Sequence, residues 1–524
     1  MKFTRSSGIL LHPTSFPGRY GIGDLGEEAY RFVDFLDETG QTLWQIMPLG
    51  PTGYGDSPYA SFSAFAGNPL LISPDLLAAD NYLSPEDLAE IPSFPTDKVD
   101  FGPVIDYKKK LLARSFHQFE ATATAEAQAY FGAFCRAKAA WLDDFALFMA
   151  LKEHFGGVVW NSWATEIASH QPEALAEWRT KLATEVRYHS YLQYQFHCQW
   201  SALKRYANQH GVKLIGDIPI FVAFDSADVW SHPDLFYLDK ANNPAFMAGV
   251  PPDYFCETGQ LWGNPLYRWK EMGQQNYSWW VERFRQTLEL VDIARIDHFR
   301  GFDAYWAVPA GEETAIKGKW LKGPGAKLFK ALQQQLGDLP IIAEDLGLIT
   351  PTVAALRNQF GFPGMKVLQF GFGGNSTEAF LPHNFERNCV VYTGTHDNDT
   401  TQGWFKSILD HERTNVQLYL GRDGTDIAWD LIRVALSSVA DIAIVPLQDI
   451  LNLGAEGRMN TPGQAGGNWG WRYPSTSVLD LIIRDRLATL TQLYSRNPIE
   501  VAKLNAEKEE QARLEFIKKG LLKS

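Results

Sequence analysis

The chain has 524 residues, of which 45% are hydrophobic, 13% aromatic and 21% charged. This composition is typical of a soluble globular protein and excludes collagen, coiled coil and disorder. The 48 Lys and Arg against 61 Asp and Glu give a formal net charge of −13. Nucleic acids and anionic membranes are therefore not expected as partners, because both repel a negative surface.

The N-terminal segment and the cysteines indicate the compartment. Residues 1–11, MKFTRSSGILL, have too short an apolar stretch for a signal peptide. The four cysteines form no CxxC pair, which suits free thiols in a reducing compartment. The apolar stretch 434–451 is interrupted by Asp441 and Asp449, whereas a membrane span needs about 18 or more apolar residues. We therefore expect a cytoplasmic protein.

Short apolar runs rich in Val and Ile recur along the chain, separated by stretches of helical pattern. Eight are clear, and they begin at Thr42, Asn68, Val212, Glu289, Leu339, Gly364, Asn388 and Asp441. Continuous apolar runs are typical of parallel strands covered on both faces. The pattern predicts an α/β protein, a (β/α)8 TIM barrel with large, mainly helical insertions. An open doubly wound sheet is the alternative.

Two segments fall outside this alternation of strands and helices. Residues from about 77 to 211 have a mostly helical pattern and far exceed a normal connection, so we expect a helical insertion there. Residues 498–524 have the pattern of an exposed, charged helical tail. Residues 1–497 are then expected to form one barrel domain that includes the insertion.

Three glycines near the N-terminus, Gly21, Gly23 and Gly26, fit the GxGxxG pattern of dinucleotide-binding loops. Pro13 and Pro17 break the preceding segment, and no second strand with an acidic residue follows about 20 positions later. We interpret the glycines as the entry to a helix, and we expect no cofactor.

Carboxylates follow three of the predicted strands: Asp297 in ARIDHFRG, Glu344 in IIAEDLG and Asp397 in YTGTHDND. Barrel enzymes place their chemistry at the carboxyl ends of the strands. Asp297 and Glu344 could therefore be the nucleophile and the acid of a retaining glycosidic cleavage, which needs carboxyl groups about 5 to 5.5 Å apart. Arg295 lies on the same strand face as Asp297 and would keep it ionised. The alternative is a buried ion pair without catalysis.

Two histidines adjoin these carboxylates, His298 and His396, and either could donate a hydrogen bond to a sugar hydroxyl. Asp, Glu and His at strand ends can also bind a divalent metal. The sequence has no HxH or HExxH pairing, however, so no metal site is expected.

Aromatic residues are interleaved with Gly and Pro in two loops, one from Pro51 and one from Gly249. Flat apolar faces beside polar edges suit pyranose rings. Taken singly, Tyr54, Tyr59, Tyr254 or Trp262 is more often a partly buried packing residue, but a long Gly- and Pro-rich loop after a strand favours a sugar contact.

These segments resemble the amylomaltase family, the 4-alpha-glucanotransferases or disproportionating enzymes of the alpha-amylase clan. The resemblance covers almost the whole chain and includes SGILLHPTSFPG, PLGPTGYGDSPYASFSAFAGNP, GDIPIFV, GQLWGNP, RIDHFRG, AEDLG, THDNDT and RMNTPG. It implies a retaining mechanism with Asp297 as the nucleophile, Glu344 as the acid/base and Asp397 as the transition-state stabiliser.

The resemblance also implies a set of substrate contacts. Arg295, His298 and His396 would hold the donor sugar, with further hydrogen bonds from Ser57, Tyr59, Asp217 and Asn468. Residues 242–264 are similar to a lid loop over the acceptor side that excludes water, with contacts from Asp253, Gln260 and Trp262. Tyr54 resembles an aromatic position in a secondary glucan site.

The function implied is that of a transferase that moves an alpha-1,4-glucan segment from one maltooligosaccharide or amylose chain to the 4-hydroxyl of another glucan or of glucose. No starch-binding module precedes Ser7, so short maltooligosaccharides and amylose segments are the expected substrates. An alpha-glucan hydrolase of the same clan and a non-catalytic glucan-binding protein are the alternatives. No obligate protein partner is expected.

Overall fold

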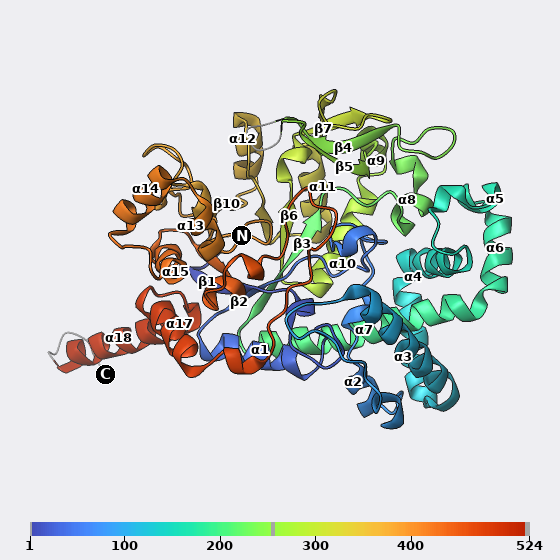
Figure 1. Ribbon diagram of the computed structural model, residues 1–524, viewed down its shortest axis with the longest axis horizontal. Coiled ribbons are helices and arrows are strands. Elements are labelled where there is room, and N and C mark those ends of the chain that lie inside the picture. Colours follow the sequence, from blue (N-terminus) through green and yellow to red (C-terminus); the bar gives the residue numbers. More distant parts are fainter. Residues whose placement is uncertain (1–2, 253–256, 519–524) are drawn as a thin grey trace.

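Eight parallel strands close into a barrel (Figure 1) in a computed structural model that describes residues 3–252 and 257–518. The strands are β1 (Ser6–Leu10), β2 (Leu43–Gln45), β3 (Lys213–Pro219), β6 (Ile293–Asp297), β9 (Ile341–Ala343), β10 (Gly364–Val367), β11 (Cys389–Tyr392) and β12 (Ile442–Pro446). Their order is β10, β11, β12, β1, β2, β3, β6, β9. The two end strands meet where the Ala343 N–H donates to the Pro363 carbonyl at 2.9 Å. The predicted (β/α)8 barrel is thus confirmed.

The strands are buried on both faces, as their continuous apolar runs require. Every residue of β1, β11 and β12 is buried. One set of side chains packs together as a cluster of its own, and it includes Leu10, Leu43, Ile215, Ile293, Ile342, Val390 and Ile444. Because these residues come from seven different strands, the barrel interior is a packed core that leaves chemistry to its ends.

Seven of the eight predicted strands are present, and the prediction for the run from Asn68 was wrong. That run forms a short 3-10 helix, Pro69–Leu71, because Pro69 starts it and the Asn68 side chain accepts the Leu70 N–H at 2.9 Å. The eighth strand is β1, which was not among the predicted strands. Its SSGIL sequence is short, but it pairs with β2 on one side and β12 on the other.

The helices cover the barrel and form a separate group beside it (Figure 1). Those around the barrel include α1 (Glu27–Glu38), α2 (Pro74–Ala79), α8 (Ala227–Ser231), α9 (Trp269–Gln274), α10 (Ser278–Leu290), α11 (Ala326–Leu336), α12 (Pro351–Gln359), α13 (Thr401–Ser407), α14 (Asp410–Leu420), α15 (Ile427–Ser437), α16 (Leu447–Ile450) and α17 (Leu481–Leu493). The segment 77–211 contains α3 (Phe101–Thr122), α4 (Ala125–His154), α5 (Thr165–Ala168), α6 (Pro172–Lys181) and α7 (Ala183–Gln209). The tail forms α18 (Pro498–Lys518), which projects away from the barrel.

A second sheet of four antiparallel strands adds to the barrel. It has the order β5 (Gln260–Pro265), β4 (Phe246–Val250), β7 (Ala304–Pro309), β8 (Lys319–Lys322). The segment expected to be a lid loop, 242–264, therefore contributes two paired strands. The sheet is built from the chain that follows β3 and β6, so it grows out of the carboxyl ends of these strands, where Figure 1 shows it above the barrel.

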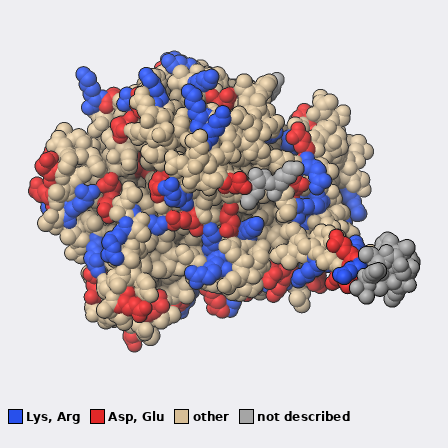
Figure 2. All heavy atoms as spheres, turned by 180° about the vertical axis from the view of Figure 1, so that it is seen from behind, with Lys and Arg blue, Asp and Glu red and all other residues tan. Residues whose placement is uncertain are grey.

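The distribution of surface charge and the apolarity of the helices indicate which macromolecular partners the protein could have. Figure 2 shows acidic and basic side chains interspersed over one face of the molecule, so the negative net charge is not gathered into a single patch there. Among the described residues, no helix has the length and apolarity that crossing a membrane would require.

Candidate active site

The two central carboxylates stand at the ends of neighbouring strands. Asp297 is the last residue of β6, and Glu344 directly follows β9. These strands pair with Ile296 opposite Ala343, and the pairing continues where the Glu344 N–H donates to the Ile296 carbonyl at 2.9 Å. The hydrogen-bonded register of two parallel strands thus places Asp297 beside Glu344.

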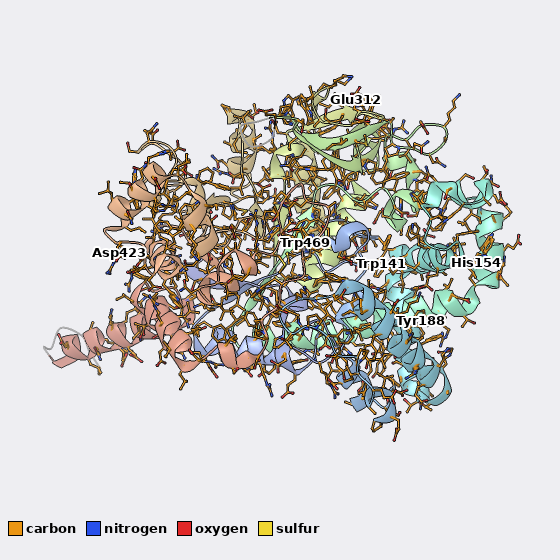
Figure 3. The ribbon with its side chains drawn as sticks, in the orientation of Figure 1. Trp141, His154, Tyr188, Glu312, Asp423 and Trp469 are labelled. Carbon is orange, nitrogen blue, oxygen red and sulfur yellow. The ribbon has the colours of Figure 1, made fainter. Side chains whose placement is uncertain are left out.

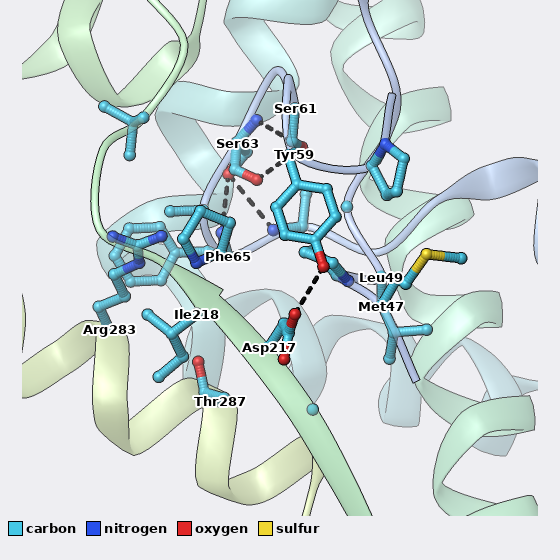
Figure 4. Close-up of a pocket in the computed structure, with 18 of the residues that line it drawn as sticks. Met47, Leu49, Tyr59, Ser61, Ser63, Phe65, Asp217, Ile218, Arg283 and Thr287 are labelled. Carbon is cyan, nitrogen blue, oxygen red and sulfur yellow. Dashed lines mark hydrogen bonds between the residues drawn. The ribbon is translucent and has the colours of Figure 1, made fainter. Parts of the chain in front are cut away.

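A buried arginine links Asp297 to the next strand. Arg295 Nη1 donates to Asp217 Oδ2 at 2.5 Å and lies 3.4 Å from Asp297 Oδ1. The side chains of Arg295 and Asp217 are only 4% and 1% exposed. Tyr59 donates its hydroxyl to the same Asp217 oxygen at 2.6 Å, at the edge of a cavity seen in Figure 4. One guanidinium therefore balances two carboxylates, as a buried charge requires.

Glu344 is held by two backbone donors. The His298 N–H donates to Oε2 at 2.7 Å, and the Leu346 N–H donates to Oε1 at 2.9 Å. Burial and the nearby charge of Asp297 raise the pKa of Glu344 to about 7, while Arg295 and the two N–H donors oppose the rise. A carboxyl group that titrates near neutral pH can both give and accept a proton.

Asp297 is the more acidic of the two groups. Burial raises its pKa to about 6, Arg295 opposes this rise, and the charges of Asp217 and Asp397 add to it. Because the two carboxyls influence each other, they titrate as a pair, and Asp297 loses its proton first. Near neutral pH the pair therefore contains one ionised carboxylate and one carboxyl that still holds much of its proton.

The third carboxylate comes from a loop. Asp397 lies in the chain between β11 and α13, and β10 stands between its strand and β9. Asn460 Nδ2 donates to Asp397 Oδ1 at 2.6 Å, and Arg458 Nη2 donates to the Asp397 carbonyl at 2.9 Å. The side chain of Asp397 is 48% exposed, so a ligand can reach it.

Aromatic contacts tie His396 to the Tyr59 loop. The His396 ring stacks on Tyr59 with centroids 5.1 Å apart and planes 17° from parallel. Trp469 lies 5.7 Å from Tyr59 and 6.0 Å from His396, and Figure 3 shows it near the middle of the molecule. Tyr59 thus connects the loop of Asp397 with the Asp217 and Arg295 pair.

The second sheet contacts the active site through Trp262, which packs against His298. Its ring meets His298 edge to face with centroids 4.9 Å apart, and its indole N–H donates to the Gln260 side chain at 3.1 Å. Burial lowers the pKa of His298 to about 3, so its imidazole is neutral. Its Nε2 atom is buried without a hydrogen bond among the described residues. Asp253 and Tyr254 lie outside the described residues.

The other predicted substrate contacts lie in loops. Ser57 Oγ accepts the Tyr59 N–H at 3.2 Å. Asn468 accepts the Thr461 N–H and donates to the Gln464 carbonyl, each at 2.9 Å, so it orders its own loop. Tyr54 begins the short helix Tyr54–Asp56, and its side chain is outside the described part of the chain.

Four further residues belong to this site and were not predicted: His12, Arg458, Asn460 and Trp469. His12 lies two residues after the end of the unpredicted strand β1 and is buried, and its pKa is lowered to about 3 by burial and the nearby His396. A histidine after an apolar run was the signal for it. Arg458 and Asn460 stand in RMNTPG, where no strand end marks them.

Comparison with known proteins identifies the family. The model of the 4-alpha-glucanotransferase family matches residues 11–477. The 4-alpha-glucanotransferase of Synechocystis sp. is 52% identical and covers 94% of this chain and 98% of its own. That of Thermus thermophilus is 50% identical and covers 90% and 95%. An amylomaltase from Streptococcus agalactiae, solved in complex with acarbose, superposes with a TM-score of 0.91 at 41% identity, covering 94% and 99%. Since these matches span most of the chain, it belongs to the 4-alpha-glucanotransferase family, as its motifs indicated.

Proposed function

We propose that this 4-alpha-glucanotransferase moves an alpha-1,4-glucan segment from one maltooligosaccharide or amylose chain to the 4-hydroxyl of another glucan or of glucose. The reaction is a retaining double displacement through a covalent glycosyl-enzyme. The observation that carries this proposal is the pair of carboxyls at neighbouring strand ends, Asp297 and Glu344, with pKa values raised to about 6 and about 7. Retaining chemistry needs one carboxylate and one carboxylic acid beside the same bond.

In the first step, an oxygen of Asp297 attacks the anomeric carbon while Glu344 gives its proton to the departing glycosidic oxygen. In the second step, Glu344 takes the proton of the acceptor 4-hydroxyl, and that oxygen displaces Asp297 from the anomeric carbon. Arg295 favours the ionised form of Asp297. Asp397, oriented by Asn460, stabilises the positive charge that develops on the sugar ring.

The proposed donor-sugar contacts are the side chains around this pair: Ser57, Tyr59, Asp217, Arg295, His298, His396 and Asn468. Tyr59 and Asp217 are hydrogen-bonded to each other, so the position of each depends on the other. The neutral imidazole of His298, with its buried Nε2, can accept from or donate to a sugar hydroxyl.

On the acceptor side, we assign Asp253, Gln260 and Trp262 to a lid, because Trp262 lies directly against His298. A lid that excludes water favours a sugar hydroxyl over water as the acceptor. Tyr54 is assigned to a secondary glucan site. Cys135, Cys198 and Cys389 are free thiols, which supports action in a reducing compartment such as the cytoplasm.

The test is a chromatogram of the purified enzyme incubated with maltotriose alone. A ladder of longer glucans together with free glucose is expected. Glucose and maltose without longer products would make the enzyme an alpha-glucan hydrolase, and unchanged maltotriose would leave a glucan-binding protein. Free labelled glucose added to amylose tests the acceptor role separately, since label should enter maltooligosaccharides.

A further inference from the structure

The loop that carries His396 and Asp397 is not fixed by the barrel itself. Strand β11 ends at Tyr392, so Asp397 stands five residues beyond the last strand hydrogen bond. Helix α13 begins only at Thr401. Between these points the position of the carboxylate depends on side-chain hydrogen bonds, since a loop has no ladder of its own.

Both ends of this loop are bound by one carboxylate, that of Asp449. Its Oδ2 accepts the hydroxyl of Thr393 at 2.5 Å and that of Thr401 at 2.8 Å, and its Oδ1 accepts the Thr401 N–H at 2.7 Å. Thr393 and Thr401 are fully buried, and Asp449 is 1% exposed. Asp449 comes from α16, directly after β12, the strand that pairs with β11. It therefore joins the loop to the neighbouring barrel strand.

The hydrogen bonds of Asp449 are better suited to fixing the position of the loop than to stabilising the fold. All three donors are neutral, and burial raises the pKa of Asp449 against their effect. A buried carboxylate with neutral donors is costly, and an apolar side chain of similar volume would fill the space more cheaply. What only the carboxylate provides is a fixed distance between Thr393 and Thr401.

The chain after Asp449 makes a second attachment at the centre of the loop. Arg458 donates to the Asp397 carbonyl, and Asn460 donates to its side chain. Arg458 Nε also donates to the Asn460 carbonyl at 2.9 Å, which orders this segment itself. The loop is thus held at both ends and in the middle by residues 449–460.

We propose that Asp449 is a positioning residue for transition-state stabilisation, acting through Thr393 and Thr401 on Asp397. This inference rests on the role of Asp397 in the proposed function. Asp449 does not touch the substrate, so its loss misplaces Asp397 and affects the transition state more than the bound ground state. Misplacement by about 1 Å can cost a reaction about 100-fold.

The experiment compares Asp449→Asn, Asp397→Asn and the double variant in maltotriose disproportionation. Asp449→Asn keeps the size of the side chain but replaces one carboxylate oxygen, an acceptor, with an amide NH2 group. That donor would face the donors of Thr393 or Thr401. We expect kcat to fall about 10- to 100-fold with KM changed less than about threefold. We expect the double variant to be no slower than Asp397→Asn alone, because the two residues act in series.

Several results would overturn the inference. Wild-type kcat in Asp449→Asn, or losses that multiply in the double variant, would show that Asp449 does not act through Asp397. If Asp397→Asn itself turned over normally, the role proposed for Asp397 would fail, and the positioning role would fail with it. A slow Asp397→Asn beside a normal Asp449→Asn would leave the proposed function intact and reject only the positioning role.

A second pair of variants covers the case in which Asp449→Asn does not fold. Thr393→Val removes one hydroxyl donor, whereas Thr393→Ser keeps it. We expect Thr393→Val to have a lower kcat than the wild type and Thr393→Ser to have a kcat close to that of the wild type. Equal activity of the two variants would contradict the proposal.

The matched control is Asp292→Asn. Asp292 also accepts a backbone N–H, that of Leu214, at 2.8 Å, but it lies at the amino end of β6. Its loss is expected to lower the melting temperature and leave kcat within about twofold.

Discussion

His298 donates its backbone N–H to Glu344 Oε2 at 2.7 Å while holding a left-handed conformation, φ 52° and ψ 52°. A residue with a β-carbon rarely adopts this conformation, and it costs on the order of 1 kcal/mol or more. Here it turns the N–H at the end of β6 toward the carboxyl at the end of β9. Each oxygen of Glu344 then accepts one N–H and keeps a lone pair for the proton that it exchanges.

The first prediction concerns pH. The kcat/KM for maltotriose should rise with pH as Asp297 becomes ionised and fall again as Glu344 loses its proton near its pKa of about 7. The curve is measured from about pH 4 to about pH 9. Glu344→Gln should remove the descending limb along with most of the activity. A profile that stays flat through this range would contradict the assignment of the pair.

Asp297→Asn should lower kcat by about 10⁴-fold or more, because it removes the nucleophile and preserves the shape of the side chain. Maltotriose binding, followed by calorimetry, should stay within about threefold of the wild-type value. The control is Asp410→Asn, whose side chain is 99% exposed and should not affect turnover. Substantial activity in Asp297→Asn would mean that another group attacks the sugar.

Arg295→Met should destabilise the protein by about 3–5 kcal/mol, because it leaves the buried carboxylate of Asp217 without its cation. It should also raise the pKa of Asp297, since Arg295 opposes protonation there. The ascending limb of the pH profile would then move to higher pH. Urea unfolding and the pH profile measure the two effects, and an unmoved limb would show that Arg295 does not tune Asp297.

Tyr59→Phe removes the hydroxyl that donates to Asp217 and keeps the ring that stacks on His396. Losing a hydrogen bond to a charged group lowers stability by about 1.5–3 kcal/mol, and the release of Asp217 from its fixed position beside Arg295 should lower kcat/KM by about 10-fold or more. Tyr206→Phe is the matched control, because its hydroxyl also donates to a carboxylate at 2.6 Å, that of Asp34. An equal loss in both variants would show a general effect on folding.

Trp262→Ala should increase hydrolysis relative to transfer, because it opens the lid beside His298 to water. The ratio is measured as new reducing ends against glucans longer than the substrate. Trp320→Ala is the comparison within the same sheet, since Trp320 is similarly exposed but packs under Arg300 instead of against His298. If the ratio were the same in both variants and the wild type, Trp262 would not govern the acceptor.

Much of the barrel could be predicted, because a strand buried on both faces has a recognisable sequence. The carboxylates were found for the same reason, since Asp297 and Glu344 directly follow such runs. Strand β1 was missed because its apolar run is only a few residues long. The run from Asn68 was wrongly predicted to be a strand because a short helix that begins at a proline can be equally apolar. Arg458 and Asn460 could not be found from local pattern. They reach Asp397 across more than 60 positions of sequence, and only the closed barrel brings them there.

The pairing of β1 with β12 has a consequence for the synthesis of the protein. Ser6 pairs with Ile442, so β1 can pair with β12, its neighbour on the side away from β2, only after roughly 430 more residues have left the ribosome, or about 20–90 s at usual rates of translation. Until then β1 presents an unpaired edge, and such edges promote aggregation. A chain released before β12 would carry that open edge permanently, so nonsense fragments of this enzyme should accumulate as aggregates or be degraded.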